Sequence, residues 1–215
     1  MFFKTRDALL LCVTMSLGQA FAPVEAQAQV RLIPQIGVYS AVEAPGSVQG
    51  VNGAYEIGKY ESTTAYGAAL EFGGDQGVGF RVGGLYAPKA ETVVSGLGCQ
   101  TGCPAGVDLL SVHGALVIRP LGRIFLVEPY LVAGGGLKRF DYNPEDLGDG
   151  IGQIFSDESK GAGILGIGAA VGLGGAALTF ELSDHFHWAD PNLDNVGRTR
   201  MDDFFFTVGL ALGGR

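Results

Sequence analysis

Between residue 31 and the C-terminus, large apolar side chains alternate with small or polar ones in eight segments, most of them about ten residues long. Successive side chains of a β-strand point to opposite faces, so this period of two predicts strands with one apolar face. The last segment is the clearest, with Phe204 and Phe206 on one face and Phe205 and Thr207 on the other. The segments are 31–42, 63–72, 78–86, 109–119, 123–137, 163–173, 178–183 and 204–212.

The connections between these segments alternate in length. Tight turns are expected at 73–77, 120–122 and 174–175, and long loops at 43–62, 88–107, 138–162 and 185–202. Short periplasmic turns, long extracellular loops and an even number of bilayer-length strands are typical of outer-membrane barrels. The pattern therefore predicts an all-β fold, an eight-stranded antiparallel up-and-down transmembrane β-barrel formed by residues 29–215.

The stretch 161–180 allows a competing interpretation, because it carries no charge and has small residues such as Gly168 and Gly172 four positions apart. Such a stretch could be a transmembrane helix with a packing face. Glycine is a poor helix former, however, and Gly174-Gly175 lies where a hairpin turn is needed. We therefore expect two strands here.

The N-terminal residues 1–28 have the features of a signal peptide. Lys4 and Arg6 precede an apolar run at 8–17, and small residues follow, with cleavage expected after Ala28. Export would place the chain in an oxidising compartment, where disulfides persist. Cys99 and Cys103 are therefore expected to form a structural disulfide within a loop.

The charge balance limits the class of partner. The formal net charge is −8, so nucleic acid is not expected to bind. Only 17% of the residues are charged, which is a smaller charged fraction than a soluble domain usually has, and 47% are hydrophobic. The composition fits a protein that faces lipid.

Two segments resemble a known family. The sequence of residues 129–136, Pro-Tyr-Leu-Val-Ala-Gly-Gly-Gly, resembles a strand common in the OmpA/OmpX-like outer-membrane β-barrel superfamily, and residues 206–212 resemble its C-terminal insertion signal. That signal usually ends in an aromatic residue, whereas this sequence ends Gly213-Gly214-Arg215. The resemblance implies a monomer in the bacterial outer membrane, in contact with its lipids and inserted by the barrel-assembly machinery, with no cofactor.

The strand parity directs several charged and polar side chains into the barrel. The expected lumen network consists of Arg31, Glu71, Arg81, His113, Arg119, Glu128 and Glu181. Charges in a narrow interior of low polarity must pair, so we interpret this set as a structural plug. A path for protons or small ions is the alternative.

The last long loop contains a candidate metal site. His185, His187 and Asp190 could ligate an ion such as Zn²⁺, with the two histidines on one face of a strand. The alternative is a segment at the membrane surface, in which Phe186 and Trp188 belong to an aromatic girdle. We favour the girdle, and expect no metal.

The functional prediction is a non-enzymatic outer-membrane barrel with a structural or surface-interaction role carried by its extracellular loops, whose ligand the sequence does not identify. One alternative is a narrow conduit for ions or small solutes. The other is a lipid-modifying enzyme, which would need Ser, His and an acid on the outer face. Ser111 and His113 have suitable chemistry, but their parity points into the lumen.

Overall fold

The computed structural model describes residues 29–44, 46–50, 53–73, 77–96, 99–142, 158–189 and 199–213, without the side chains of 46–50, 53–55 and 99–102. The proposed signal peptide at 1–28 lies outside the described residues. All regular structure in the described part is β-strand. The strands are β1 (Val30–Ala41), β2 (Gly46–Gly50), β3 (Gly53–Ile57), β4 (Thr63–Phe72), β5 (Gly77–Gly96), β6 (Cys99–Arg119), β7 (Val127–Tyr142), β8 (Glu158–Gly172), β9 (Ala176–Ala189), β10 (Thr199–Met201) and β11 (Asp203–Leu212).

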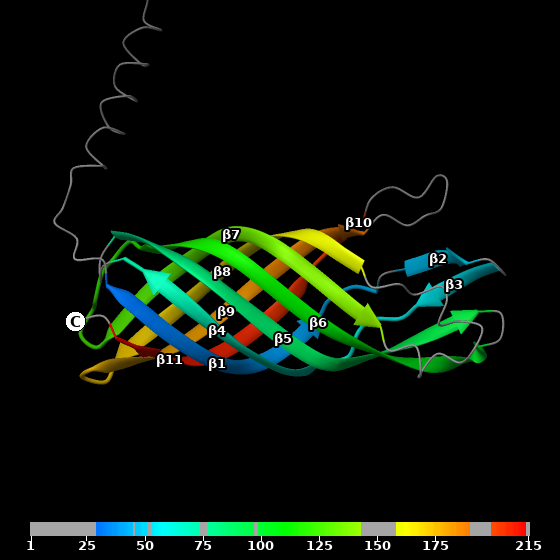
Figure 1. The fold of residues 1–215 in the computed structure, drawn as a ribbon, viewed down its shortest axis with the longest axis horizontal. Coiled ribbons are helices and arrows are strands. Elements are labelled where there is room, and N and C mark those ends of the chain that lie inside the picture. Colours follow the sequence, from blue (N-terminus) through cyan, green and yellow to red (C-terminus); the bar gives the residue numbers. More distant parts are fainter. Residues whose placement is uncertain are drawn as a thin grey trace, which may run out of the picture.

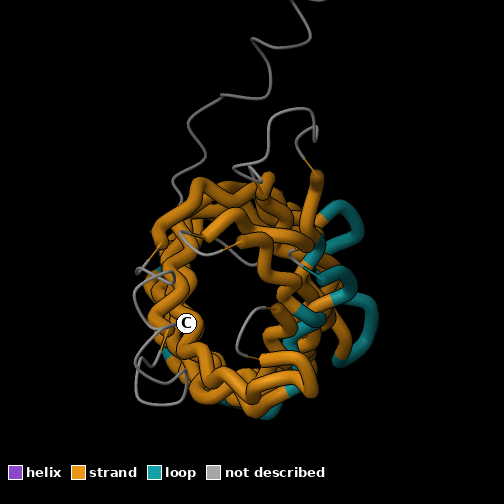
Figure 2. The backbone as a smooth tube through the Cα atoms, turned by 90° about the vertical axis from the view of Figure 1, so that its right-hand side faces the viewer, coloured by secondary structure: helices purple, strands orange, loops and turns teal. Residues whose placement is uncertain are grey.

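Eight of these strands close into a barrel. Each pairs antiparallel with the next in the order β1, β4, β5, β6, β7, β8, β9 and β11, and β11 pairs back with β1. Closure satisfies the backbone hydrogen bonds that an open sheet edge would leave unpaired in lipid. Figure 2 shows the strands as a ring around a central space. Buried inward-pointing side chains occupy this space. The predicted eight-stranded antiparallel barrel is confirmed.

The two faces of the wall follow the predicted alternation. The outer face presents large apolar side chains, such as Ile36, Val78 and Leu165, each more than half exposed. The inner face carries small, polar and aromatic side chains, and Phe205 and Thr207 are among those buried there. An apolar belt around a barrel with a polar interior is the arrangement expected of a wall that faces lipid.

The stretch 161–180 is not a helix. Its residues belong to β8 and β9, which form a hairpin through Gly174, a glycine with a φ of +83°. The described residues contain no helix long and apolar enough to span a membrane. Glycine decides the outcome, because it disfavours helix and permits the left-handed backbone of the turn.

All four predicted long loops contain strand residues, so their bounds are wrong. β2 and β3 lie within 43–62, β7 and β8 extend into 138–162, and strands also continue into the other two. β5 and β6 extend to Gly96 and from Cys99, although residues 88–107 were expected to form a loop. A register shift between Ala87 and Ala90 accommodates Pro88, so the missing N–H of the proline does not end the pairing. Likewise β9 runs on to Ala189 and pairs with β10, where a loop at 185–202 was expected.

The turn after β6 is longer than predicted. β7 begins at Val127 and not at residue 123, so the connection runs from Pro120 to Leu126. Phe125 has a positive φ of 58° and is 94% exposed, which belongs to a turn and not to a strand. The connections β4–β5, β6–β7 and β8–β9 lie at the end of the barrel where β11 finishes, and β2 and β3 lie at the other end (Figure 1). We call these the turn end and the loop end.

Candidate functional site

The inward side chains form three layers along the barrel axis, of which the ionic layer lies nearest the turn end. It contains Glu71 from β4 at its centre, directly opposite Arg81 on β5 and Arg31 on β1. Arg81 donates from Nε and Nη2 to Glu71 Oε2 at 3.2 and 2.8 Å. Arg119 also donates to Glu71, and Arg31 Nη1 lies 3.6 Å from its Oε1. One carboxylate thus serves three guanidinium groups.

Two further carboxylates complete the ionic layer. Glu181 on β9 pairs with Arg81, and Glu128 on β7 pairs with Arg119. The side chains of both arginines and of Glu71 and Glu128 are at most 5% exposed, so the charges are removed from water. Buried charges of this kind are tolerated because they are paired and hydrogen-bonded.

Tyr130 packs beneath the arginines of this layer. Its ring centroid lies 5.3 Å from the Arg81 guanidinium carbon and 6.0 Å from that of Arg119. The ring occupies the space beside Gly168, its partner residue on β8, where an added Cβ would lie only 2.3 Å from Tyr130 Cζ. The small inner face of β8 therefore makes room for side chains from the facing strand.

The middle layer contains two histidines and two serines. His185 on β9 is 1% exposed, with Nδ1 3.0 Å from Ser111 Oγ and Nε2 3.3 Å from Ser183 Oγ. The His113 ring stands edge-on to it, with ring centroids 5.4 Å apart. His113 thus lies in the lumen but apart from the ionic layer with which it was grouped in the predicted network.

The aromatic layer lies nearer the loop end and surrounds a second buried ion pair. Lys138 on β7 pairs with Asp203 on β11, and the two side chains are 0% and 1% exposed. Tyr39 donates its hydroxyl to Asp203 Oδ1 at 2.6 Å. The ammonium of Lys138 lies 5.1 to 5.9 Å from the ring centroids of Tyr39, Phe140 and Phe205. The described residues therefore enclose the pair and keep it from solvent.

The sequence did not identify this second pair. Lys138 was placed at the start of a loop, and Asp203 directly after one. The alternation already indicated where these residues point. Lys138 lies an even number of residues after Glu128 and Tyr130, and Asp203 lies two residues before Phe205, so each shares a strand face with inward residues. Extending the alternation past the expected membrane boundary would have found both residues.

Two of the three candidate metal ligands lie inside the barrel. His185 and His187 share the inner face of β9, and Asp190 lies outside the described residues. His185 is held by two serine hydroxyls, and His187 Nδ1 lies 3.4 Å from Asp203 Oδ2. The described residues contain no cluster of three or more His, Cys, Asp or Glu side chains able to hold a metal ion.

The girdle interpretation of the same segment has geometric support. Phe186 and Trp188 lie on the outer face of β9, with their rings edge-to-face at 5.8 Å between centroids. Arg200 lies above the Phe186 ring at 4.5 Å and pairs with Asp184 and Asp202. Aromatic and charged side chains at one height are the composition expected where a barrel leaves the membrane core.

The cysteines lie at the tip of the long β5–β6 hairpin. Cys103 is disulfide-bonded, and the side chain of Cys99 lies outside the described residues. The Cys99–Cys103 pairing therefore stays a prediction. Ser111 and His113 are both buried on the inner face of β6, away from the lipid-facing surface that a lipid-modifying site would need.

No family model and no curated protein matches the sequence. The fold is nevertheless similar to solved structures. The outer membrane protein OprG from Pseudomonas aeruginosa superposes with a TM-score of 0.57 at 18% identity, over 86% of this chain and 96% of that one. Neisserial surface protein A superposes with a TM-score of 0.54 at 11% identity, over 85% and 96%. The chain thus has the fold of the small outer-membrane β-barrels.

Proposed function

We propose that this protein is a non-enzymatic barrel of the bacterial outer membrane with a structural or surface-interaction role, carried by the loop end. Two features support the proposal. The interior is filled by side chains in three layers, and the strands at the loop end extend well beyond the length that a bilayer requires. The filled interior is the observation on which the proposal mainly rests.

The filled interior argues against a conduit. A continuous water path would have to pass the ionic layer and then the enclosed Lys138–Asp203 pair, whose side chains have almost no exposure. Next to that pair, a cluster of buried apolar side chains that includes Tyr39, Leu109 and Phe205 continues toward the loop end. An eight-stranded barrel has an interior just wide enough for side chains, and here they occupy it.

The loop end offers a rigid surface. β5 and β6 are 20 and 21 residues long, whereas a tilted strand needs about 9–11 residues to cross a bilayer. The excess forms a projecting hairpin, and β3 pairs with its edge at Glu56–Ser95 and Ile57–Val94, so that β2, β3, β5 and β6 form a small sheet outside the barrel. Recognition surfaces are commonly carried on loops held by such a scaffold.

Electrical recording tests the filled interior. Reconstituted into a planar bilayer, the protein is expected to show no steady single-channel conductance. A steady conductance that Glu71→Gln abolishes would instead support the conduit. Mass spectrometry of lipid A from cells that express the protein and from cells that lack its gene tests the lipid-modifying alternative, because an altered lipid would require an enzyme.

Trimming the projecting sheet tests the role of the loop end. Residues 46–57 are replaced by a short Gly/Ser turn, and folding of the barrel is checked by heat-modifiable gel migration. Cells that lack the gene are supplied with the full or the trimmed protein and are then compared for detergent sensitivity and for adherence to surfaces. The trimmed protein is expected to fail in at least one of these assays. Full complementation in both would refute a role for this end.

A further inference from the structure

The connection between β6 and β7 exposes large apolar side chains at the turn end. The neighbouring β8–β9 connection adds one more, and the two connections are joined because the Gly172 N–H donates to the Leu126 carbonyl at 2.9 Å. We call these side chains the apolar tip, which consists of Leu121, Ile124, Phe125, Leu126 and Leu173. Each is about half exposed or more, and Phe125 is 94% exposed. Turns in water are usually built from Gly, Asn, Asp, Pro and Ser, so an apolar turn indicates a partner.

The backbone at Phe125 is strained. Two hydrogen bonds between Ile124 and Val127, at 2.8 and 3.1 Å, close a two-residue turn in which Phe125 takes the first central position. Its φ is +58°, and a positive φ at that position is usually supplied by glycine. The side chain is almost fully exposed, so packing within the protein does not offset the strain. Strain that persists in a native structure points to a function of the residue that carries it.

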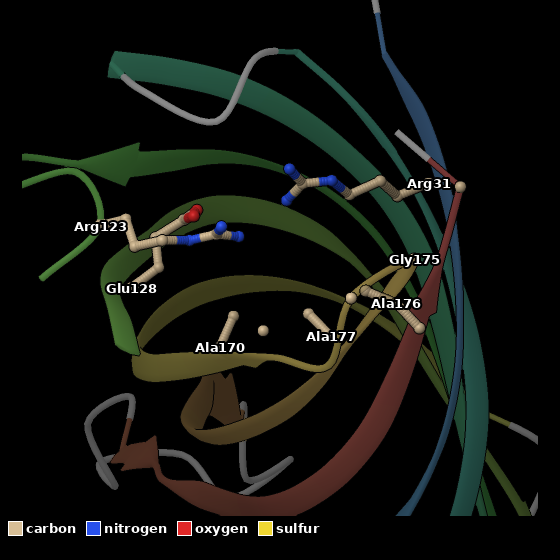
Figure 3. A pocket seen from close by; sticks show the side chains of 11 residues that line it. Arg31, Arg123, Glu128, Ala170, Gly175, Ala176 and Ala177 are labelled. Atoms are coloured by element: carbon tan, nitrogen blue, oxygen red, sulfur yellow. The ribbon is translucent and has the colours of Figure 1, made fainter. Parts of the chain in front are cut away.

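The charged residue of the same connection points elsewhere. In Figure 3 the Arg123 side chain is directed into the mouth of the barrel, where it lines an opening together with Glu128. Its guanidinium lies beside Gly172, where an added Cβ would be 3.3 Å from Nη2. The side chains of the apolar tip do not line this opening. The connection therefore has a charged side toward the mouth and an apolar side away from it.

The apolar tip continues the lipid-facing surface of the barrel. Leu173 lies six residues after Ile167, which is more than half exposed on the outer face of β8, so the alternation places both on one face. On β7 the outer face begins at Val127, directly after Leu126, and continues at Leu131. The tip thus adjoins the apolar belt on two strands, which favours lipid as its partner over a separate protein.

We propose that the apolar tip is inserted into the phospholipid leaflet at the turn end, so that the β6–β7 connection is a membrane anchor and not a turn in water. Apolar side chains at the boundary between headgroups and acyl chains bind a membrane in proportion to the apolar area they bury. Burial of the Phe125 ring in lipid would offset the strain of its backbone. The inference rests on the proposed location of the barrel in a membrane.

The test measures the depth of single tryptophans in vesicles of phosphatidylcholine with brominated acyl chains, which quench tryptophan fluorescence on contact. Phe125→Trp is introduced together with Trp188→Phe, since Trp188 is the only tryptophan of the chain. Ile36→Trp, on the outer face of β1, and Lys59→Trp, at an exposed position of the loop end, are made in the same background. We expect brominated lipid to quench Phe125→Trp about as strongly as Ile36→Trp. Acrylamide, a quencher dissolved in water, should quench it several-fold less than Lys59→Trp.

Folding of each variant is checked by heat-modifiable migration. If Phe125→Trp does not fold, Leu173→Trp decides, because it probes the same tip without the positive φ of residue 125. Strong quenching by acrylamide with little quenching by brominated lipid would refute the anchor and leave the tip free for a protein. If Ile36→Trp is quenched by brominated lipid and the tip is not, only this inference fails. If neither is quenched, the membrane location fails as well.

Discussion

The enclosed Lys138–Asp203 pair allows a direct test of whether the lumen is dry. Replacing Lys138 by Met keeps most of the side-chain volume. Among the described residues, it leaves Asp203 with only the Tyr39 hydroxyl as a close donor and His187 Nδ1 at 3.4 Å. The two side chains of the pair are 0% and 1% exposed, so the remaining carboxylate has no access to solvent. Breaking a buried pair by removing one partner costs about 3–5 kcal/mol, and we expect this loss for Lys138→Met.

The double variant Lys138→Met/Asp203→Leu separates charge from packing. With both charges gone, the Met and Leu side chains lie among Tyr39, Phe140 and Phe205, and replacing a buried pair by apolar residues is often neutral or stabilising. We therefore expect the double variant to recover most of the stability that the single variant loses. Lys59→Met, at an exposed position, is the control and should change stability by less than about 0.5 kcal/mol.

Urea unfolding in lipid vesicles measures these free energies. The only tryptophan, Trp188, is half exposed on the outer face of β9 and reports transfer out of the membrane through its fluorescence. If Lys138→Met costs less than about 1 kcal/mol, water reaches Asp203 and the filled-lumen argument is refuted. If the double variant loses the sum of the free energies lost by Lys138→Met alone and by Asp203→Leu alone, the stability comes from packing of the two side chains and not from their pairing.

Three further predictions concern local packing, the disulfide and the whole fold. Gly168→Ala should destabilise the barrel by about 1–3 kcal/mol in the same assay, because its Cβ would overlap the Tyr130 ring, whereas Gly161→Ala meets no atom within 4 Å and should cost far less. Peptide mass spectrometry of unreduced protein should recover Cys99 linked to Cys103, and reduction should cost about 2 kcal/mol, as expected for so short a loop; a different partner for Cys103 would refute the pairing. Unboiled protein should migrate differently from boiled protein on SDS gels, and identical migration would contradict a folded barrel.

The strand pattern was predictable because it depends on local chemistry. Alternation of side chains is set by the strand backbone itself, so one sequence reveals which residues point inward. Glu71 and Arg81 could be paired from the sequence because they stand opposite each other in one hairpin. Where the sequence failed, as at Pro88, a bulge absorbed a residue that usually ends a strand.

Contacts across the lumen could not be read in the same way. Lys138 on β7 meets Asp203 on β11, and β8 and β9 lie between these strands in the wall. Likewise Ser111 on β6 meets His185 on β9. Such contacts depend on closure of the barrel and on the height of each residue along its axis, and neither quantity is contained in the alternation alone.

The strand face on which a residue lies and its position along the barrel axis together account for what each inward residue does. Near the turn end, six strands each contribute one charged side chain at similar height, so the charges share partners and form the ionic layer. Nearer the loop end, the inward residues that the structure describes are mainly aromatic. They enclose the Lys138–Asp203 pair, whose carboxylate is also contacted by Tyr39 and His187 but by no second cation of the ionic-layer kind. Charge removed from the ionic layer can be compensated in part by neighbouring carboxylates or guanidinium groups, whereas charge removed from the Lys138–Asp203 pair cannot. The same kind of substitution should therefore be more damaging in the aromatic layer, even though the ionic layer contains more charges.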